Sequence, residues 1–202
     1  SLRDTPLYGW NIIGKRLLDI IFASLVLIIT SPVIGIVALL IKITSQGPVF
    51  FKQERMGMDG KIFNMLKFRT MFINAEQETG PVWTKKGDPR CTKTGKFLRR
   101  TSIDELPQFI NVLRGDMSIV GPRPERPVFI QNFRNTIPKY MLRHKMKAGI
   151  TGWAQVSGWR GNTSLEKRIE YDLYYIENWT LNFDLKIIWL TLWNGFVNKH
   201  AY

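Results

Sequence analysis

The sequence predicts an α+β protein, mostly helical, in which a re-entrant membrane helix precedes a small globular domain. Three patterns predict this class. Residues 17–41 are almost entirely apolar, and Ser31 and Pro32 interrupt them near the middle. Residues 49–71 alternate polar and apolar side chains around a glycine-containing turn, which is typical of a β-hairpin. Two segments within residues 164–197 have the amphipathic pattern of helices that lie at a membrane interface.

The apolar segment is long enough to enter a bilayer, because about 20 apolar residues in a helix cross the hydrocarbon core. A proline inside a helix removes one backbone hydrogen bond and bends the helix. Basic residues stand on both sides, at residues 15–16 and at Lys42. A straight spanning helix would place these basic ends on opposite faces, against the positive-inside tendency. We therefore expect residues 15–44 to bend at Ser31 and Pro32, re-enter the same leaflet and keep both ends in the cytoplasm.

A buried core helix is the alternative interpretation of this segment. A core helix of this length is rarely apolar all round, so we favour the membrane. Asp19 is the one charge within the apolar run, and its place in the first turns fits the depth of the membrane interface. The resulting division is a leader over residues 1–14, a membrane helix over 15–44 and a globular domain over 45–202. The chain begins with Ser1 rather than Met, which we interpret as a fragment of a longer protein.

The composition limits the partners and the compartment. The chain of 202 residues has a formal net charge of +13, which indicates either nucleic acid or an anionic membrane surface as partner. The apolar segment favours the membrane. Cys91 is the single cysteine, so an internal disulfide framework is excluded and a reducing compartment is favoured. Most of the seven tryptophans follow residue 150, and tryptophan favours the membrane–water interface.

The remaining elements follow from turn signals and periodicity. Glycine and proline separate one element from the next, and Gly115 is a typical stop signal for a helix. In chain order we expect a strand over 49–53, a turn over 56–60, a strand over 61–71, a loop over 79–95, a short helix over 107–114, a rigid bend over 121–124, a helical segment over 125–147 around Pro138, an irregular stretch over 149–161, a helix over 164–179 with a capping serine or threonine, and a second helix over 183–197.

The first candidates for chemistry are Asp104 and Glu105, which precede the helix that Pro107 helps to start. A helix N-terminus stabilises negative charge, so we expect both carboxylates to stay ionised. An ionised aspartate can act as a nucleophile or bind Mg²⁺. The alternative is structural, because residues 102–105 match a capping box in which Ser102 is the cap and Glu105 reaches back to it. The pair alone favours this structural interpretation.

The basic residues around this pair shift the interpretation towards a polyanionic substrate such as a diphosphate. Arginine binds phosphate oxygens bidentately, and Mg²⁺ bridges phosphates to one or two carboxylates. Lys67 and Arg69 alternate with apolar residues, so in a strand they point to one side. Arg123 stands between two prolines, which suits a preorganised phosphate contact as well as it suits a plain turn. For most of the other basic residues, a solvated face or a contact with lipid headgroups is the better interpretation.

Several common sites are excluded. His144 and His200 have no partner at metal-ligand spacing, so a zinc site is not expected. The chain contains no dinucleotide-binding G-x-G-x-x-G, no P-loop and no nucleophilic serine motif. Nucleotide recognition therefore uses none of the common glycine-rich loops.

Nearly the whole chain, from about residue 15 to 192, resembles the monotopic polyprenyl-phosphate phosphoglycosyl transferases, the bacterial sugar transferase family. Six segments in this order make the resemblance highly specific. They are the apolar segment with Ser31 and Pro32, Lys67-Phe68-Arg69-Thr70-Met71, Asp104-Glu105-Leu106-Pro107-Gln108, residues 111–118, Gly121-Pro122-Arg123-Pro124, and residues 149–156. Residues 158–161 and 170–175 are more similar to the exopolysaccharide branch, whose members often load glucose or galactose phosphate. Members of that branch often carry additional N-terminal membrane helices and a soluble domain.

The resemblance implies a two-step reaction at the cytoplasmic face of the bacterial inner membrane. Asp104 attacks the β-phosphate of a UDP-sugar, UMP leaves, and undecaprenyl phosphate then takes the phosphosugar from the enzyme. Mg²⁺ is the implied cofactor, bound through Asp104, and Glu105 assists in positioning or proton handling. Residues 45–202 then form the catalytic domain. The residues implied to hold phosphates are Lys67, Arg69, Arg99 and Arg123.

One residue departs from the family pattern, and one other class of function is open. Ala148 stands where the family usually has proline before the Gly-Ile-Thr-Gly run, which would loosen the loop without removing a reactive group. A membrane-anchored basic module that binds nucleic acid or anionic lipid would explain the charge but not Asp104 and Glu105. With the enzyme interpretation, nucleic acid is not an expected partner. Tryptophan and leucine side chains within residues 183–197 would serve either membrane lipid or the second subunit of a homodimer.

Overall fold

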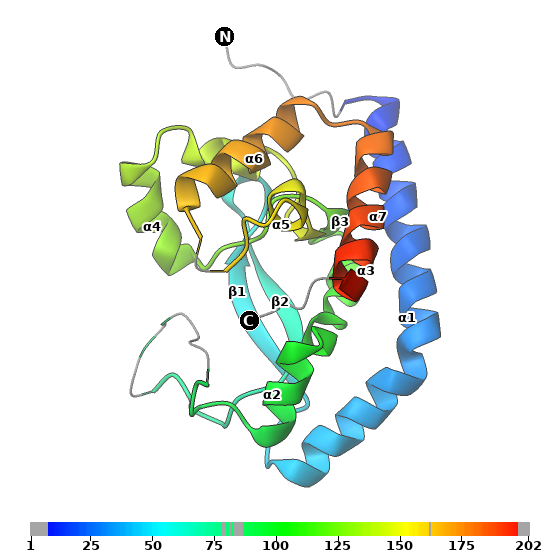
Figure 1. Ribbon diagram of the computed structural model, residues 1–202, viewed down its shortest axis with the longest axis vertical. Coiled ribbons are helices and arrows are strands. Elements are labelled where there is room, and N and C mark those ends of the chain that lie inside the picture. The colour runs from blue at the N-terminus through cyan, green and yellow to red at the C-terminus, as the bar shows by residue number, and fades with distance from the viewer. Residues whose placement is uncertain (1–7, 78–79, 81, 83–86, 162, 198–202) are drawn as a thin grey trace.

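The computed structural model describes residues 8–77, 80, 82, 87–161 and 163–197 and is α+β and mostly helical (Figure 1). Helix α1, Trp10–Thr44, runs along one side of the molecule and bends in its second half. The helix begins inside the expected leader, so the boundary at residue 15 was wrong, and residues 1–7 lie outside the described part. Gly9, with a φ of 58°, marks the start instead.

Pro32 bends α1 without interrupting it, because a side chain replaces the missing backbone donor. Proline has no N–H to donate to the carbonyl four residues earlier, which belongs to Ile28. The Ser31 hydroxyl donates to the Ile28 carbonyl at 2.9 Å. The expected break at Ser31 and Pro32 is therefore a bend within one continuous helix.

The predicted β-hairpin is confirmed. Strands β1, Phe50–Met56, and β2, Ile62–Phe68, pair antiparallel from Phe50 opposite Phe68 to Met56 opposite Ile62. The short 3₁₀ helix η1, Met58–Gly60, forms the turn. The second strand ends three residues earlier than expected, so Arg69 lies beyond it.

Among the described residues, the other elements are mostly short helices and two three-residue strands. They are α2 Lys93–Arg100, η2 Ile103–Glu105, α3 Gln108–Arg114, β3 Ser118–Val120, α4 Pro127–Thr136, η3 Tyr140–Lys145, β4 Gly149–Thr151, α5 Trp153–Val156, α6 Leu165–Glu177 and α7 Leu181–Val197.

The predicted helices before Gly115 and after residue 164 are confirmed. Gly115 ends α3 with a φ of 90°, and the Ser164 side chain accepts from the Lys167 amide at the start of α6. The loop expected over residues 79–95 ends earlier, because Thr92 caps α2; part of this loop lies outside the described residues. The segment expected to be helical around Pro138 divides into α4 and η3.

The stretch over residues 149–161 was expected to be irregular, but it contains β4 and α5. Strand β4 pairs parallel with β3, from Ser118 opposite Gly149 to Val120 opposite Thr151. Strands of three residues are too short for an alternating pattern to identify them. This pairing brings residues 121–126, which follow β3, beside the hairpin.

The largest hydrophobic core joins α1 to the globular domain. Ala23 of α1, Met65 of β2, Val120 of β3, Tyr175 of α6 and Ile187 of α7 are all buried in it. Figure 1 shows α7 lying alongside the first half of α1. Burial of these side chains from five elements supplies the main stabilisation of the arrangement.

The charged residues at the start of α1 bind the domain rather than a membrane surface. Lys15 forms a buried ion pair with Asp184 at 2.6 Å, and Arg16 donates to carbonyls at the end of α3. Asp19 accepts from the Ser118 hydroxyl at 2.9 Å and is 3% exposed. The expected place of Asp19 at the membrane interface was therefore wrong. Because Lys15 and Arg16 contact the domain, they give weaker support for the re-entrant topology than expected.

The apolar side chains of α1 that face away from the domain are largely exposed, among them Leu25, Ile28 and Ile29. The helix has a mean hydropathy of 2.7 over its most apolar window, and its length and composition are sufficient to cross a membrane. On α7, Trp189 and Trp193 are also exposed and stack at 6.2 Å between ring centroids. These surfaces indicate membrane association.

Candidate active site

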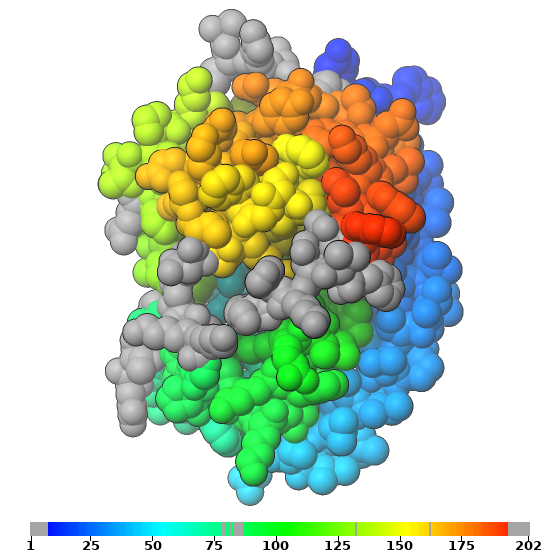
Figure 2. Space-filling model, in the orientation of Figure 1, coloured from blue at the N-terminus to red at the C-terminus, as the bar shows by residue number. Residues whose placement is uncertain are grey.

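The residues proposed from the sequence converge on one cavity of about 660 Å³. The hairpin, η2, residues 121–126, α5 and α6 contribute to its lining. Arg99 of α2 and Gln155 of α5 also line it, and Figure 2 shows the parts of the surface formed by α2, in green, and the α5 region, in yellow. Its volume lies in the range of small-molecule sites, roughly 300–1,000 Å³. The expected residues that line it are Lys67, Arg69, Arg99, Asp104, Glu105 and Arg123.

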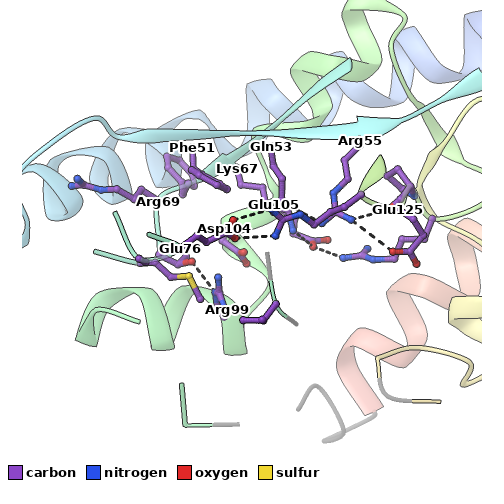
Figure 3. A pocket seen from close by; sticks show the side chains of 18 of the residues that line it. Phe51, Gln53, Arg55, Lys67, Arg69, Glu76, Arg99, Asp104, Glu105 and Glu125 are labelled. Atoms are coloured by element: carbon purple, nitrogen blue, oxygen red, sulfur yellow. Dashed lines mark hydrogen bonds and ion pairs between the residues drawn. The ribbon is translucent and has the colours of Figure 1, made fainter. Parts of the chain in front are cut away.

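The carboxylate pair lies on η2, a single 3₁₀ turn ahead of α3. Ser102 adopts the left-handed conformation, with a φ of 57°, and its side chain makes no capping hydrogen bond. Glu105 does not reach back to Ser102 but faces Lys67 and Arg123. The capping-box interpretation was therefore wrong. The turn instead presents both carboxylates to the cavity (Figure 3).

Asp104 is a buried carboxylate with no hydrogen-bond partner in the part of the chain that the structure describes. It is 6% exposed and accepts no hydrogen bond from the residues that the structure describes. Burial raises its pKa to about 6, and the charges of Lys67, Arg99 and Arg123 oppose this rise only in part. A helix N-terminus was expected to keep this group ionised. Burial works against that effect, yet a carboxyl group with a pKa of about 6 is still mostly ionised at neutral pH.

Glu105, one residue later, has the opposite environment. Its Oε1 accepts from Lys67 Nζ at 2.9 Å and from Arg123 Nη2 at 2.7 Å. Burial alone would raise its pKa, but Arg123 and Lys67 hold the pKa well below its ordinary value. Burial lowers the pKa of Lys67, and Glu105 opposes that change. Glu105 therefore stays ionised and holds two cations at the cavity.

The structure brings Arg99 to the cavity but turns Arg69 away from the carboxylate pair. Arg99 Nε donates to the Thr70 hydroxyl at 2.7 Å. The Arg69 guanidinium contacts the Gln46 carbonyl and donates to the Ser45 carbonyl at 2.9 Å. These groups follow the C-terminus of α1, where a cation is favourable. Figure 3 shows Arg69 apart from Asp104 and Glu105.

Sequence reasoning missed a second group of charged residues at the other end of the cavity. Glu125 and Asp172 are buried there, and each pairs with a buried arginine. Arg168 pairs with Glu125 at 3.1 Å, and Arg143 pairs with Asp172 at 2.7 Å. One signal was available: no acid lies between residues 126 and 165, so a buried arginine there needs an acid from outside that stretch.

The described residues contain no cluster of three or more His, Cys, Asp or Glu that could hold a metal ion. Magnesium does not require one, because it is often held by one or two carboxylates together with substrate phosphates and water. The Asp104 carboxylate lines the cavity and accepts no hydrogen bond from the described residues, so it fits this kind of site. Within the described part of the cavity, the ion's other ligands would come from the substrate and water.

A long apolar helix joined to a small domain, with a carboxylate pair among basic side chains, defines a membrane-associated protein with a basic cavity. The comparison with protein families gives the narrower class. The chain belongs to the family described as bacterial sugar transferase, whose model matches residues 10–198.

Curated relatives cover the whole chain. It is 54% identical over 205 residues to the UDP-glucose:undecaprenyl-phosphate glucose-1-phosphate transferase of Escherichia coli K12, with 100% of this chain and 44% of that protein covered. It is 44% identical over 194 residues to an Aeromonas hydrophila UDP-N-acetylgalactosamine-undecaprenyl-phosphate N-acetylgalactosaminephosphotransferase, with 95% and 45% covered. The chain thus spans less than half the length of these relatives.

Proposed function

We propose that this chain transfers a sugar 1-phosphate from a UDP-sugar to undecaprenyl phosphate and releases UMP. The observation that carries the proposal is the Asp104 carboxylate, which accepts no hydrogen bond from the described residues, beside the paired Glu105 in a basic cavity. The names of the relatives supply the substrate classes. A nucleophile without competing partners, surrounded by cations, suits attack on a diphosphate.

The reaction proceeds in two displacements at the β-phosphorus. An Asp104 oxygen forms a bond to this phosphorus, the bond to the bridging oxygen breaks, and UMP leaves with that oxygen. An oxygen of undecaprenyl phosphate then attacks the same phosphorus and releases the carboxylate. The product is the lipid-linked sugar diphosphate, and Asp104 returns to its initial state.

The basic residues have distinct tasks in this proposal. Lys67, Arg123 and Glu105 all line the cavity, so Glu105 holds the two cations where diphosphate oxygens arrive. Arg99 lines the same cavity and is a third phosphate contact. Arg69 remains a proposed phosphate contact from the resemblance, but its guanidinium would have to leave the end of α1.

We propose Mg²⁺ as the cofactor, with Asp104 as its protein ligand. When bound, the ion would neutralise charge on the diphosphate. Chelation with EDTA should abolish UMP release, and added Mg²⁺ should restore it. Full activity in EDTA-treated protein would overturn the metal assignment while leaving the transfer reaction intact.

The membrane arrangement is a further part of the proposal. The exposed side of α1 enters the inner membrane from its cytoplasmic face, bends at Ser31 and Pro32, and returns. This brings the cavity to the lipid headgroups, where the acceptor phosphate lies. In a Cys91→Ser background, single cysteines at positions 1 and 202 should label from the same side. Labelling from opposite sides would refute the re-entrant topology, and Pro32→Ala should reduce transfer as well as change the labelling.

UMP release in detergent or nanodiscs is the decisive measurement, with undecaprenyl phosphate and a panel of UDP-glucose, UDP-galactose and UDP-N-acetylgalactosamine. Glucose or galactose is the proposed sugar. Asp104→Asn should lower the rate at least about a thousandfold. Asp59→Asn in the hairpin turn is the matched control and should retain wild-type activity. Turnover that persists in Asp104→Asn would refute the nucleophile.

A covalent intermediate has its own test. Without the lipid acceptor, intact-mass spectrometry should find one hexose phosphate, less water, attached to the wild type and none on Asp104→Asn. The rival proposal, a basic module that binds nucleic acid or anionic lipid, would instead give salt-dependent DNA binding without UMP release. The exposed tryptophans of α7 could also serve a homodimer, and light scattering in nanodiscs tests this.

A further inference from the structure

Residues 122–125 form a row of backbone carbonyls that are all held by hydrogen bonds. Proline has no N–H, so Pro122 and Pro124 give this segment only two backbone donors. Its conformation therefore depends on what its carbonyls accept. The donors are the Gly149 amide to Pro122 at 3.0 Å, Arg143 Nη2 to Arg123 at 2.8 Å, Arg55 Nη1 to Pro124 at 3.1 Å and the Met56 amide to Glu125 at 3.0 Å.

Arg143 holds the carbonyl of the residue whose side chain reaches the catalytic carboxylates. Its Nη2 also donates to Asp172 at 2.7 Å, and its Nη1 donates to the Tyr140 hydroxyl at 3.2 Å. Only 2% of Arg143 is exposed, and it does not line the cavity itself. The Arg123 side chain extends from this fixed backbone to Glu105 at 2.7 Å.

A buried ion pair usually adds little to the free energy of unfolding. Removing two charges from water costs about as much as their attraction returns, and apolar residues of similar size are often as stable. Arg143 and Asp172 are both almost fully buried where an apolar pair would fill the space. What an apolar pair could not supply is a donor to the Arg123 carbonyl.

We propose that Arg143 is a positioning residue for the transfer reaction, which fixes the backbone of Arg123 so that its guanidinium meets Glu105 and the diphosphate. The inference rests on the proposed function. Asp172 orients Arg143 and neutralises its charge. A displacement of about 1 Å in such a contact can cost up to about a hundredfold in rate.

The test separates charge balance from positioning. Arg143→Met leaves Asp172 buried and unpaired, so the double variant Arg143→Met/Asp172→Asn is the informative protein. We expect it to regain most of the melting temperature lost by Arg143→Met, yet to release UMP at least tenfold more slowly than wild type, with the loss in kcat. A double variant that regains both stability and rate would overturn the proposal.

Ile169→Ala controls for lost stability. Ile169 is buried on α6 in the cluster with Ile130 and Tyr140, away from the cavity lining. It should lower the melting temperature without slowing UMP release below that temperature. If the double variant does not fold, Arg143→Lys decides instead: a folded Lys variant with wild-type kcat would overturn the proposal, and a lowered kcat would support it.

A second readout does not depend on turnover. The distance from Arg123 Nη2 to Glu105 Oε1 is 2.7 Å here, and a crystal or cryo-EM structure of the double variant measures it directly. We expect the Arg123 guanidinium to move away from Glu105 in that variant. An unchanged contact would overturn the positioning role even if wild type releases no UMP. Absence of UMP release together with a displaced Arg123 would refute the proposed function alone.

Discussion

The two ends of the cavity treat buried carboxylates in opposite ways. At one end Asp104, 6% exposed, has no hydrogen bond from the described residues. At the other, Glu125 and Asp172 are buried to a similar degree and each pairs with an arginine. An unpaired buried carboxylate costs stability, whereas a paired one can hold structure. The difference indicates that the Asp104 end is arranged for reaction and the other end for holding the framework.

The same substitution at the two ends should have opposite effects on stability. Asp172→Asn leaves Arg143 buried without its counter-ion and should lower the free energy of unfolding by about 2–4 kcal/mol. Burial raises the pKa of Asp104 and that of Asp172 alike, to about 6, so the difference comes from the partner that each variant leaves behind. Asp104→Asn leaves no buried hydrogen-bonded cation without its counter-ion among the described residues, and should raise the free energy of unfolding by about 1–3 kcal/mol. Chemical denaturation at pH 7.5 measures both. Loss of stability in both variants would remove the distinction between the two ends.

Glu105 joins the two patterns, since it is paired like Asp172 but adjoins Asp104. Glu105→Gln should slow UMP release about ten- to a hundredfold and lower the free energy of unfolding by about 1–3 kcal/mol, because Lys67 and Arg123 lose their shared anion. The charge of Glu105 raises the pKa of Asp104, so the variant should move the acid limb of the pH–rate profile to lower pH. A shift to higher pH would contradict the arrangement described for this pair.

The pH dependence of the rate should report the Asp104 carboxyl, whereas that of stability also includes Asp172, whose pKa burial raises to about 6 as well. The nucleophile must be ionised, so kcat/KM should fall below about pH 6, by up to tenfold per pH unit. The sign for stability is opposite. The folded state binds the proton more tightly than the unfolded state, so this group costs stability as pH rises from about 4 to about 6, and the full cost remains above pH 6. Asp104→Asn should lack this contribution, as thermal melts across the range would show.

Local signals predicted the hairpin and the helix ending at Gly115. Each of these signals, the alternation of side chains and the glycine that ends a helix, is contained in a short stretch of sequence. They could not show which of the many basic residues meet the carboxylates. Arg69 was expected at a phosphate, and it lines the cavity while its guanidinium donates to the Ser45 carbonyl after the end of α1. Lys15 was expected at the membrane surface and pairs with Asp184, far away in the sequence. Such contacts depend on packing between elements that are distant in the sequence, and no periodic pattern in the sequence predicts them.

The capping-box pattern failed for a related physical reason. Ser102 in the left-handed conformation cannot cap a helix with its side chain in the usual way, and nothing in residues 102–105 alone predicts that conformation. The cations that Glu105 meets come from β2 and from the segment after β3. The local pattern was present, but tertiary ion pairs outweighed it.

The smallest expected effect concerns Ala148, which precedes β4 beside the row of held carbonyls. Its carbonyl accepts from the Ser118 amide at 2.9 Å, and its own N–H donates no hydrogen bond among the described residues. Proline, the usual family residue here, would lose no such bond and would restrict the unfolded chain. Ala148→Pro should therefore raise the free energy of unfolding by about 0.4–1 kcal/mol, and Ala148→Gly, its matched control, should lower it similarly.

Neither Ala148 variant should change kcat by more than about twofold, if the backbone of residues 122–125 that Arg143 helps to hold is already as well ordered as its contacts indicate. The neighbouring Gly149 amide holds the Pro122 carbonyl in this structure, so proline would strengthen an existing constraint rather than create one. UMP release and thermal melts on the three proteins decide the matter. A large gain in rate with proline would show that the Arg123 backbone moves during turnover, and that this segment takes part in the reaction rather than only holding its framework.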